Sequence, residues 1–241
     1  VNTIEEMIDL CTTFIACKSM DGDRVVIVTN SGGPGVLAAD RGEEVGMDMA
    51  EVSPEMIDTL KTFLPPFCGF KNPVDLTVEG TEEGYRKTLV TLLEAYDAAI
   101  AMNICPPYLD ASSHAKGVAD AFDIMGKPVL ANFLPNQVVA DSVKYLKERG
   151  IPNFPSGERA IETLARLSDY HKRKRIIKEH GGFSEVWQKL QSKIAGQTSK
   201  LPGGERILEP EAMGWLRDLG IPVPEFHFAS DEAQAIDDCE S

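Results

Sequence analysis

The sequence predicts an α/β protein whose first part is a doubly wound parallel sheet, with a helical extension behind it. Short apolar runs recur at residues 24–28, 98–104, 127–133 and 151–154, and a weaker alternating run lies at 47–52. Runs of this length and composition are typical of strands that are buried on both faces. Segments with helical spacing separate the runs, and this alternation indicates right-handed crossovers in one parallel sheet. We therefore expect one α/β domain over about residues 20–156.

Helices are expected at residues 3–17, 36–45, 53–63, 80–95, 110–125, 135–149 and 157–179. Three of them begin at residues that commonly cap helices: Thr3 and Thr81 are each followed by acidic residues, and Ser53 is followed by a proline. Side-chain oxygens at such positions accept hydrogen bonds from free helix amides, and acidic residues favour the positive end of the helix dipole. Gly46 and Gly150 are typical of helix ends.

The pattern changes from residue 157. The basic run at 171–175 lies late in its helix, where it favours the dipole and is typical of a solvated face. Docking towards an acidic surface or a nucleotide is the alternative. Further helices are expected at 183–194 and 206–220, with a linker at 195–204, an extended segment at 221–224 and an acidic end at 231–241. Residues 205–241 are too few to fold as a domain and look like the start of one.

The composition narrows the class of protein. Of 241 residues, 43% are apolar and 26% charged, which is typical of a globular protein. The formal net charge of −14 disfavours nucleic acids and anionic membranes as partners, because their phosphates repel an acidic protein. No run reaches the length of a membrane span, and no signal segment stands at the start. Five scattered cysteines without a C-x-x-C pair indicate free thiols in a reducing cytoplasm and no metal site.

One stretch combines a strand, a glycine-rich turn and the start of a helix. Residues 24–28 (RVVIV) form the strand, residues 29–35 (TNSGGPG) the turn, and the helix is expected from residue 36. The first amides of a helix have no internal partner, the helix dipole is positive there, and glycines let an anion approach the backbone. The expected phosphate-binding residues are Asn30, Ser31, Gly32, Gly33, Gly35 and Val36. Because the stretch is neither a P-loop nor a full dinucleotide fingerprint, a tight connection without a ligand is the alternative.

A second informative stretch is residues 68–77 (CGFKNPVDLT), which is polar at its centre. Asn72 and Asp75 stand on either side of a Pro-Val pair, and the residue before a proline adopts an extended conformation. Such side chains cap a neighbouring element, line a ligand site, or do both. The residues alone leave these uses open.

Four strings carry a resemblance to a known family: VVIVTNSGGPGVLAAD (25–40), EVSPEMIDTLKTFLPP (51–66), KNPVDL (71–76) and GIPNFPSGERAIETLARL (150–167). They resemble the NDP-forming acyl-CoA synthetases, the family of ADP-forming acetyl-CoA synthetase, which is related to succinyl-CoA synthetase. The string ILEPEAMGWLRDLGIPVPE (207–225) resembles the start of the ATP-grasp half of fused members. The resemblance implies an internal piece of a longer polypeptide. It would hold a flavodoxin-like CoA-ligase domain (1–156), a helical extension and linker (157–204), and a truncated ATP-grasp start (205–241).

The family members are acid–thiol ligases. They convert an acid, CoA and ATP to acyl-CoA, ADP and phosphate through an acyl phosphate and a phosphohistidine. The resemblance implies that the loop from Asn30 to Val36 is one of two helix N-termini facing that histidine. Backbone amides from Ser31 onward would bind the phosphate, the side chains of Asn30 and Ser31 would assist, and Asn72 and Asp75 would lie in a neighbouring loop. It also implies that the full-length enzyme binds CoA and ATP or ADP with Mg²⁺. The implied partners are the other domains of the enzyme and a small-molecule acid, and a homo-oligomer is possible.

The chain also departs from the family pattern. The phosphorylated histidine of the family lies in a Ser-His-Thr-Gly string of the preceding ligase domain, and this string is absent here. His114 follows two serines at a helix start, and we expect it at the surface. We therefore expect no catalytic residue in this chain and no turnover by the chain alone. A regulatory region of a protein acetyltransferase and a non-catalytic docking domain are the alternatives.

Overall fold

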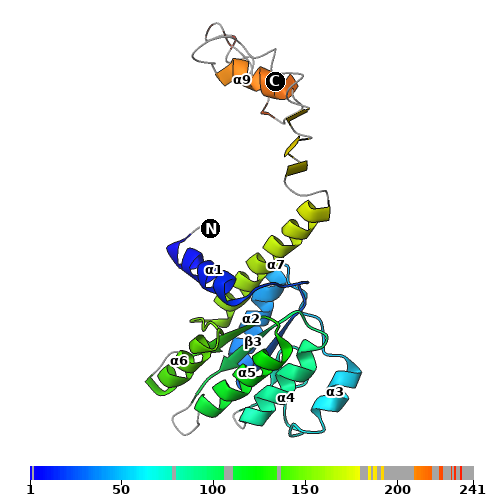
Figure 1. Cartoon of the computed structure of the whole chain (residues 1–241), viewed down its shortest axis with the longest axis vertical. Helices are drawn as coiled ribbons and strands as arrows, with labels where there is room; N and C mark the ends of the chain where they lie inside the picture. Colours follow the sequence, from blue (N-terminus) through cyan, green and yellow to red (C-terminus); the bar gives the residue numbers. More distant parts are fainter. Residues whose placement is uncertain are drawn as a thin grey trace. The chain divides into compact units, whose positions relative to one another are not determined.

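The computed structural model describes residues 1, 3–77, 80–105, 111–134, 137–179, 184–185, 187–188, 191–192, 209–218, 223–224, 229, 231 and 234. Its contacts divide the chain into two units, Val1–Arg175 and Ile176–Ser241, which are described separately. The sheet and the helices around it belong to the first unit (Figure 1). The domain boundaries expected at residues 156 and 204 stay a prediction.

The sheet has four described strands, all parallel, in the order β2-β1-β3-β4. The strands are β1 (Val25–Thr29), β2 (Val74–Asp75), β3 (Ala98–Asn103) and β4 (Val129–Phe133). Val25 pairs with Ala98, and Ala99 pairs with Val129. Every residue of β1, β3 and β4 is buried, as a sheet covered on both faces requires. The predicted α/β class with a doubly wound sheet is confirmed.

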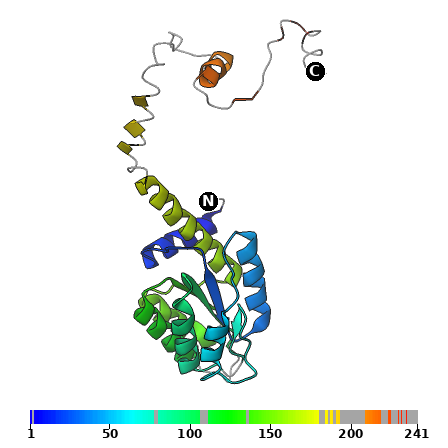
Figure 2. The ribbon, with the colours of Figure 1, turned by 90° about the vertical axis from the view of Figure 1, so that its right-hand side faces the viewer.

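Alternate strand residues face two separate apolar layers. Val26 and Val28 join the layer formed with α3 (Pro54–Leu60), α4 (Glu82–Leu93), α5 (Ala111–Met125) and α6 (Ala140–Glu148). Val25 and Ile27 join the layer formed with α2 (Gly32–Glu44) and α7 (Gly157–Glu179). Figures 1 and 2 show these helices on the two faces of the sheet. The period of two in the strands therefore supplies both halves of the core.

The helix caps expected from the sequence are confirmed. Helix α1 (Ile4–Ala16) begins after Thr3, whose hydroxyl accepts a hydrogen bond from the Glu6 N–H at 3.1 Å. The side chains of Ser53 and Thr81 cap α3 and α4 in the same way. In the second unit, α9 (Glu209–Asp218) lies within the helix expected at 206–220. The described residues of 183–194 are helical, whereas the linker at 195–204 lies outside the described residues.

Two expected strands are wrong. The runs at 47–52 and 151–154 each make a single bridge, Arg24 to Asp48 and Ala131 to Asn153. Asparagine side chains occupy the next places along the ladder. The Asn72 amide bonds the Ile27 N–H and the Val25 C=O, and the Asn153 amide bonds the N–H and C=O of Phe133.

Two helix boundaries also differ from expectation. Helix α2 begins at Gly32 instead of residue 36, because Pro34 presets the helical φ within the first turn and outweighs the low propensity of glycine. The helix expected at 135–149 is divided into a short 3₁₀ turn, Gln137–Val139, followed by α6. Within the described residues, no helix combines the length and hydropathy needed to cross a bilayer.

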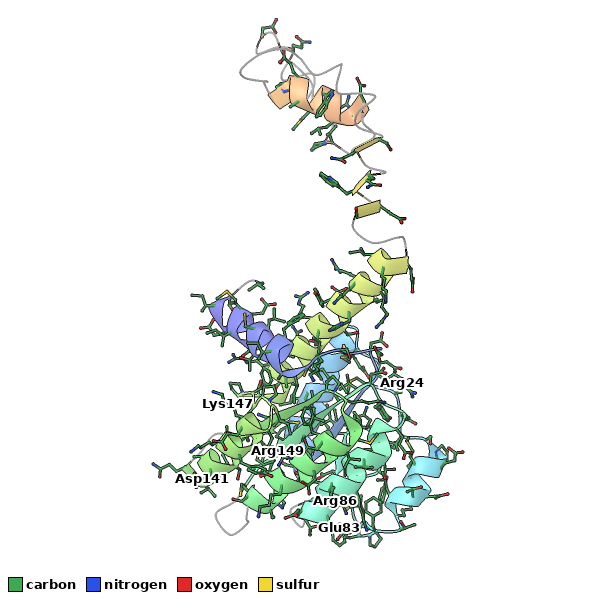
Figure 3. All side chains as sticks on the ribbon, in the orientation of Figure 1. Arg24, Glu83, Arg86, Asp141, Lys147 and Arg149 are labelled. Atoms are coloured by element: carbon green, nitrogen blue, oxygen red, sulfur yellow. The ribbon has the colours of Figure 1, made fainter. Side chains whose placement is uncertain are left out.

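The two ends of the sheet lie at opposite ends of the first unit. Figure 3 labels Arg24, which directly precedes β1 at the amino edge, and Glu83 in the first turn of α4 near the carboxyl edge. The Arg24 guanidinium lies 5.3 Å from the Tyr96 ring centroid and pairs with the Asp48 carboxylate at 3.3 Å. The expected phosphate-binding residues follow β1 and therefore lie at the carboxyl edge.

Candidate anion-binding site at the carboxyl edge

The strand order places the candidate site at a topological switch point. Strands β1 and β3 are neighbours, and the helices that follow them, α2 and α5, pack into opposite layers. In doubly wound folds, ligands bind outside the carboxyl ends of the strands at such a point. The turn between β1 and α2 is therefore in the expected position for a ligand.

A buried threonine shapes this turn. The hydroxyl of Thr29 accepts a hydrogen bond from the Ser31 N–H at 3.0 Å and donates one to the Ser31 C=O at 2.9 Å. Ser31 is the N-cap of α2, and its own hydroxyl makes no capping hydrogen bond. The Ser31 amide is therefore occupied by the protein, whereas its hydroxyl is available at the helix end.

The first turn of α2 leaves two adjacent backbone donors available. Pro34 has no N–H, and from Val36 onward each N–H bonds a carbonyl four residues earlier in the helix. Among the described residues, no partner is found for the N–H of Gly32 or Gly33. An anion at this helix end would meet these two amides, whereas the amide of Val36 belongs to the helix.

The glycines of the turn differ in the space around them. A Cβ at Gly33 would meet no atom within 4 Å, so the position beside the free amides is open. A Cβ at Gly35 would lie 3.1 Å from Thr29 Cγ2 and 3.3 Å from Pro73 Cβ. Gly35 therefore allows the helix to approach the loop before β2, whereas Gly33 leaves room for a ligand.

Asp75 places a carboxylate beside the same helix end. A Cβ at Gly32 would lie 3.2 Å from Asp75 Oδ2, and Asp75 Oδ1 accepts a hydrogen bond from the Thr77 N–H at 2.8 Å. The helix dipole stabilises an acidic group in this position. The same carboxylate repels a second anion, so it limits how strongly phosphate binds to this helix end alone.

The two asparagines expected at the site use their amides inside the protein. Asn30 is 2% exposed; its Nδ2 donates to the Ile104 C=O at 2.9 Å, and its Oδ1 accepts from the Ile104 N–H at 2.8 Å. Asn72 bonds the amino half of β1 and also donates to the Ala50 C=O at 3.2 Å. Asn30 thus joins the ends of β1 and β3, and Asn72 supports the edge of β1.

A buried cluster that sequence reasoning missed lies at the end of β3. His114 is only 3% exposed, so the expectation that it lies at the surface is wrong. Its Nδ1 lies 2.7 Å from Asn103 Nδ2, and its Nε2 contacts the Gly80 C=O. These partners fit a neutral ring that accepts at Nδ1 and donates at Nε2. The start of α5 packs under the loop before α4, which is why this helix-start histidine is buried.

Tyr85 completes this cluster. Its ring lies 5.2 Å from the His114 ring, centroid to centroid, and its hydroxyl donates to the Met102 C=O at 2.7 Å. Burial raises the pKa of Tyr85, so its hydroxyl stays protonated at neutral pH. Asn103 Oδ1 is buried without a hydrogen-bond partner. The sequence contained one sign of buried polar groups at this edge. An asparagine stands at or near the end of three apolar runs: Asn30, Asn103 and Asn132.

The described residues contain no group of three or more His, Cys, Asp or Glu side chains that could hold a metal ion. The site therefore consists of backbone donors, the Ser31 hydroxyl and one carboxylate. The structure brings Gly32, Gly33 and Asp75 together and directs the amides of Asn30 and Asn72 elsewhere.

The comparison with protein families identifies the fold. The model of the Ligase-CoA domain matches residues 25–175, which include the whole sheet and the turn described above. The chain belongs to this family. A similar solved structure is the dinucleotide-forming acetyl-coenzyme A synthetase 1 of Ca. Korarchaeum cryptofilum in complex with phosphate and ADP. It is 26% identical with a TM-score of 0.63, over 72% of this chain and 39% of that one. The flavodoxin-like, succinyl-CoA synthetase-like ligase fold is confirmed.

Curated relatives of this Ligase-CoA chain are longer proteins. The ADP-forming acetate–CoA ligase I of Archaeoglobus fulgidus is 30% identical over 242 aligned residues, which cover 100% of this chain and 34% of the relative. Subunit alpha of the ADP-forming acetate–CoA ligase II of Pyrococcus furiosus is 36% identical over 163 residues, or 65% of this chain and 35% of the subunit. The chain thus spans about a third of the length of these relatives.

Proposed function

We propose that this chain is the part of an ADP-forming acyl-CoA synthetase that stabilises the phosphoryl group in transit. The observation that supports this most directly is the pair of free amides, Gly32 and Gly33, at the positive end of α2. Fixed donors suit this task because they stabilise developing charge without reorganising and offer no competing nucleophile. The Ser31 hydroxyl lies at the same helix end and would add a third donor.

The rest of the reaction is assigned to other parts of the full-length enzyme. The proposed overall reaction converts an acid, CoA and ATP to acyl-CoA, ADP and phosphate. A histidine of a preceding domain would present the phosphoryl group, and CoA and the nucleotide with its Mg²⁺ would bind outside the residues described. The relatives support this division, since about two-thirds of their length lies outside the matched region.

Asp75 has a role in this proposal. Its Oδ1 is engaged by Thr77, and its Oδ2 lies beside Gly32. The free carboxylate oxygen can accept a hydrogen bond from an imidazole N–H or from a protonated phosphate oxygen. A bound partner that carries both a phosphoryl group and an N–H therefore fits this helix end better than inorganic phosphate does.

The test is a titration of the chain with inorganic phosphate, followed by the amide NMR signals of Gly32 and Gly33. We expect a dissociation constant on the order of millimolar, because each charge-assisted hydrogen bond contributes about 1.5–3 kcal/mol. In Gly33→Leu the side chain fills the open space, and the affinity should fall at least about tenfold. Gly214→Leu in α9, where a Cβ also meets nothing within 4 Å, is the matched control.

The full-length enzyme gives the second readout. Gly33→Leu should lower phosphohistidine formation while circular dichroism and the unfolding midpoint of the enzyme stay unchanged. Wild-type phosphohistidine formation in this variant would refute the proposal. A docking domain without a ligand predicts no phosphate-dependent change of the Gly32 and Gly33 signals at all.

A further inference from the structure

Helix α1 exposes its apolar side. The large apolar residues Ile4, Ile8 and Ile15 are 69%, 55% and 85% exposed. With Met7 and Cys11, which are also exposed, they form the outer α1 face. Ile4, Ile8, Cys11 and Ile15 follow the spacing i, i+4, i+7 and i+11, so they lie along one stripe of the helix.

The inner side of α1 is mostly polar, with Leu10 half-buried and the Phe14 ring packed edge-on against Tyr170 of α7 at 5.0 Å between centroids. Asp9 Oδ2 accepts a hydrogen bond from Arg159 Nε of α7 at 2.8 Å and lies 2.7 Å from Arg159 Nη2, and Glu6 pairs with Arg166 of α7 at 3.6 Å. Only Thr13 is fully buried within α1. Between α1 and α7 lies a cavity of about 210 Å³, and a second one of about 560 Å³ extends from α1 to the end of α2.

This arrangement reverses the usual amphipathic pattern, in which the apolar stripe of a surface helix faces the core. Partly exposed ion pairs contribute about 0–1 kcal/mol each, whereas burying a large apolar side chain contributes about 1.5–3 kcal/mol. The ion pairs with α7 hold α1 in place with the more strongly stabilising groups turned outward. A partner that covers the outer α1 face would recover that apolar burial.

We propose that the outer α1 face docks onto an apolar surface of another domain of the same synthetase polypeptide. This inference rests on the proposed function, because it requires the longer polypeptide. The relatives support the presence of such a domain, since this chain spans about a third of their length. The cavity beside α1 is lined by Asp23 and Met47, which flank the amino edge of the sheet. The docking surface therefore lies at the end opposite the anion site, as Figure 1 shows for α1.

A second copy of the chain is a less suitable occupant. A helix of 13 residues is about 20 Å long, so its stripe offers a few hundred Å², roughly, whereas stable complexes bury about 800 Å² per partner. Two copies would also bring together chains with a net charge of −14 each. A domain on the same polypeptide needs less area, because tethering raises its effective concentration to about the millimolar range.

Cys11 provides a direct test, because it is exposed on the outer α1 face while Cys17, Cys68 and Cys105 are buried. Its alkylation rate by iodoacetamide is measured by mass spectrometry of the peptide that carries it, in this chain and in the full-length enzyme. We expect Cys11 to react at least about tenfold more slowly in the full-length enzyme. Ile8→Gln in the full-length enzyme should restore the faster rate, and Thr12→Gln, at an exposed polar position of α1, should not.

Equal Cys11 rates in the chain and the full-length enzyme would overturn the inference. A second result would also overturn it: a Cys11 rate that falls as the concentration of the chain alone is raised, together with a dimer in sedimentation. The occupant of the outer α1 face would then be a second copy of the chain. If phosphate does not change the Gly32 and Gly33 amide signals while Cys11 still reacts slowly in the full-length enzyme, the proposed function is refuted. The docking surface would stand in that case. The two proposals therefore fail separately.

Discussion

The carboxyl edge of the sheet and the outer α1 face use their residues in opposite ways. At the carboxyl edge, the side chains that look suited to ligand binding, Asn30 and Asn72, are bonded inside the domain, and backbone amides remain free. On α1, Glu6 and Asp9 pair with arginines of α7, and the isoleucines remain exposed. The groups that each region leaves unused define its partner, an anion at the first and an apolar surface at the second.

Within these two regions the largest expected effect concerns Asn30, because its amide is hydrogen-bonded inside the domain. Asn30→Ala removes both hydrogen bonds to Ile104 and leaves its N–H and C=O without partners at a partly buried position. The free energy of unfolding should fall by about 2–3 kcal/mol, measured by urea denaturation. Ser31→Ala is the neighbouring control, since its hydroxyl makes no capping hydrogen bond. It should change stability by less than about 0.5 kcal/mol.

If Asn30→Ala has the same free energy of unfolding as the wild type but loses phosphate binding, the structural role of Asn30 is wrong. The asparagine would then act on the ligand, and the contrast between side chains and backbone at the carboxyl edge would not hold.

The next expected effect separates the two sides of α1. Burial raises the pKa of the Cys17 thiol at the inner end of α1 from 9.0 to about 11. Between these values the unfolded chain loses the Cys17 proton and the folded chain keeps it. The stabilisation is therefore complete below pH 9 and is lost as the pH rises towards 11, by about 1.4 kcal/mol per pH unit at most.

Urea unfolding at pH 8, 9.5 and 10.5 under reducing conditions measures this loss, with Cys17→Ala as the reference. The wild type should lose stability more steeply than Cys17→Ala, while both share any contribution from the buried Tyr85. Parallel pH profiles would mean that Cys17 is accessible to water, and the inner side of α1 would then be as open as the outer one.

The fold was largely predictable because its signals are local. The short apolar runs became β1, β3 and β4, and the caps Thr3, Ser53 and Thr81 were recognisable from three or four neighbouring residues. The two wrong strands failed for a non-local reason. Asn72 comes from the loop before β2, and Asn153, inside the second run, bonds Phe133 through its side chain instead of its backbone. Strand propensity encodes neither replacement.

The position of the site was predictable from the sequence, but the roles of its side chains were not. Glycines after a buried strand indicated the helix end, yet the partner of Asn30 lies 74 positions away in the sequence, at Ile104. His114 was expected at the surface because it follows two serines at a helix start, while its burial depends on the loop at Gly80. Side-chain roles at the carboxyl edge are set by contacts between strand ends, which only the assembled sheet reveals.

The smallest expected effect tests the outer α1 face within this chain. Ile8→Gln should change the free energy of unfolding by less than about 0.5 kcal/mol, because Ile8 is 55% exposed. Leu164→Ala in α7, where Leu164 is fully buried, should cost about 2–5 kcal/mol in the same urea titration. A loss for Ile8→Gln that approaches that of Leu164→Ala would show that α1 already buries its apolar side in this chain. The near-neutral result is the informative one, because an isoleucine that contributes nothing to its own domain is free to stabilise the contact with another.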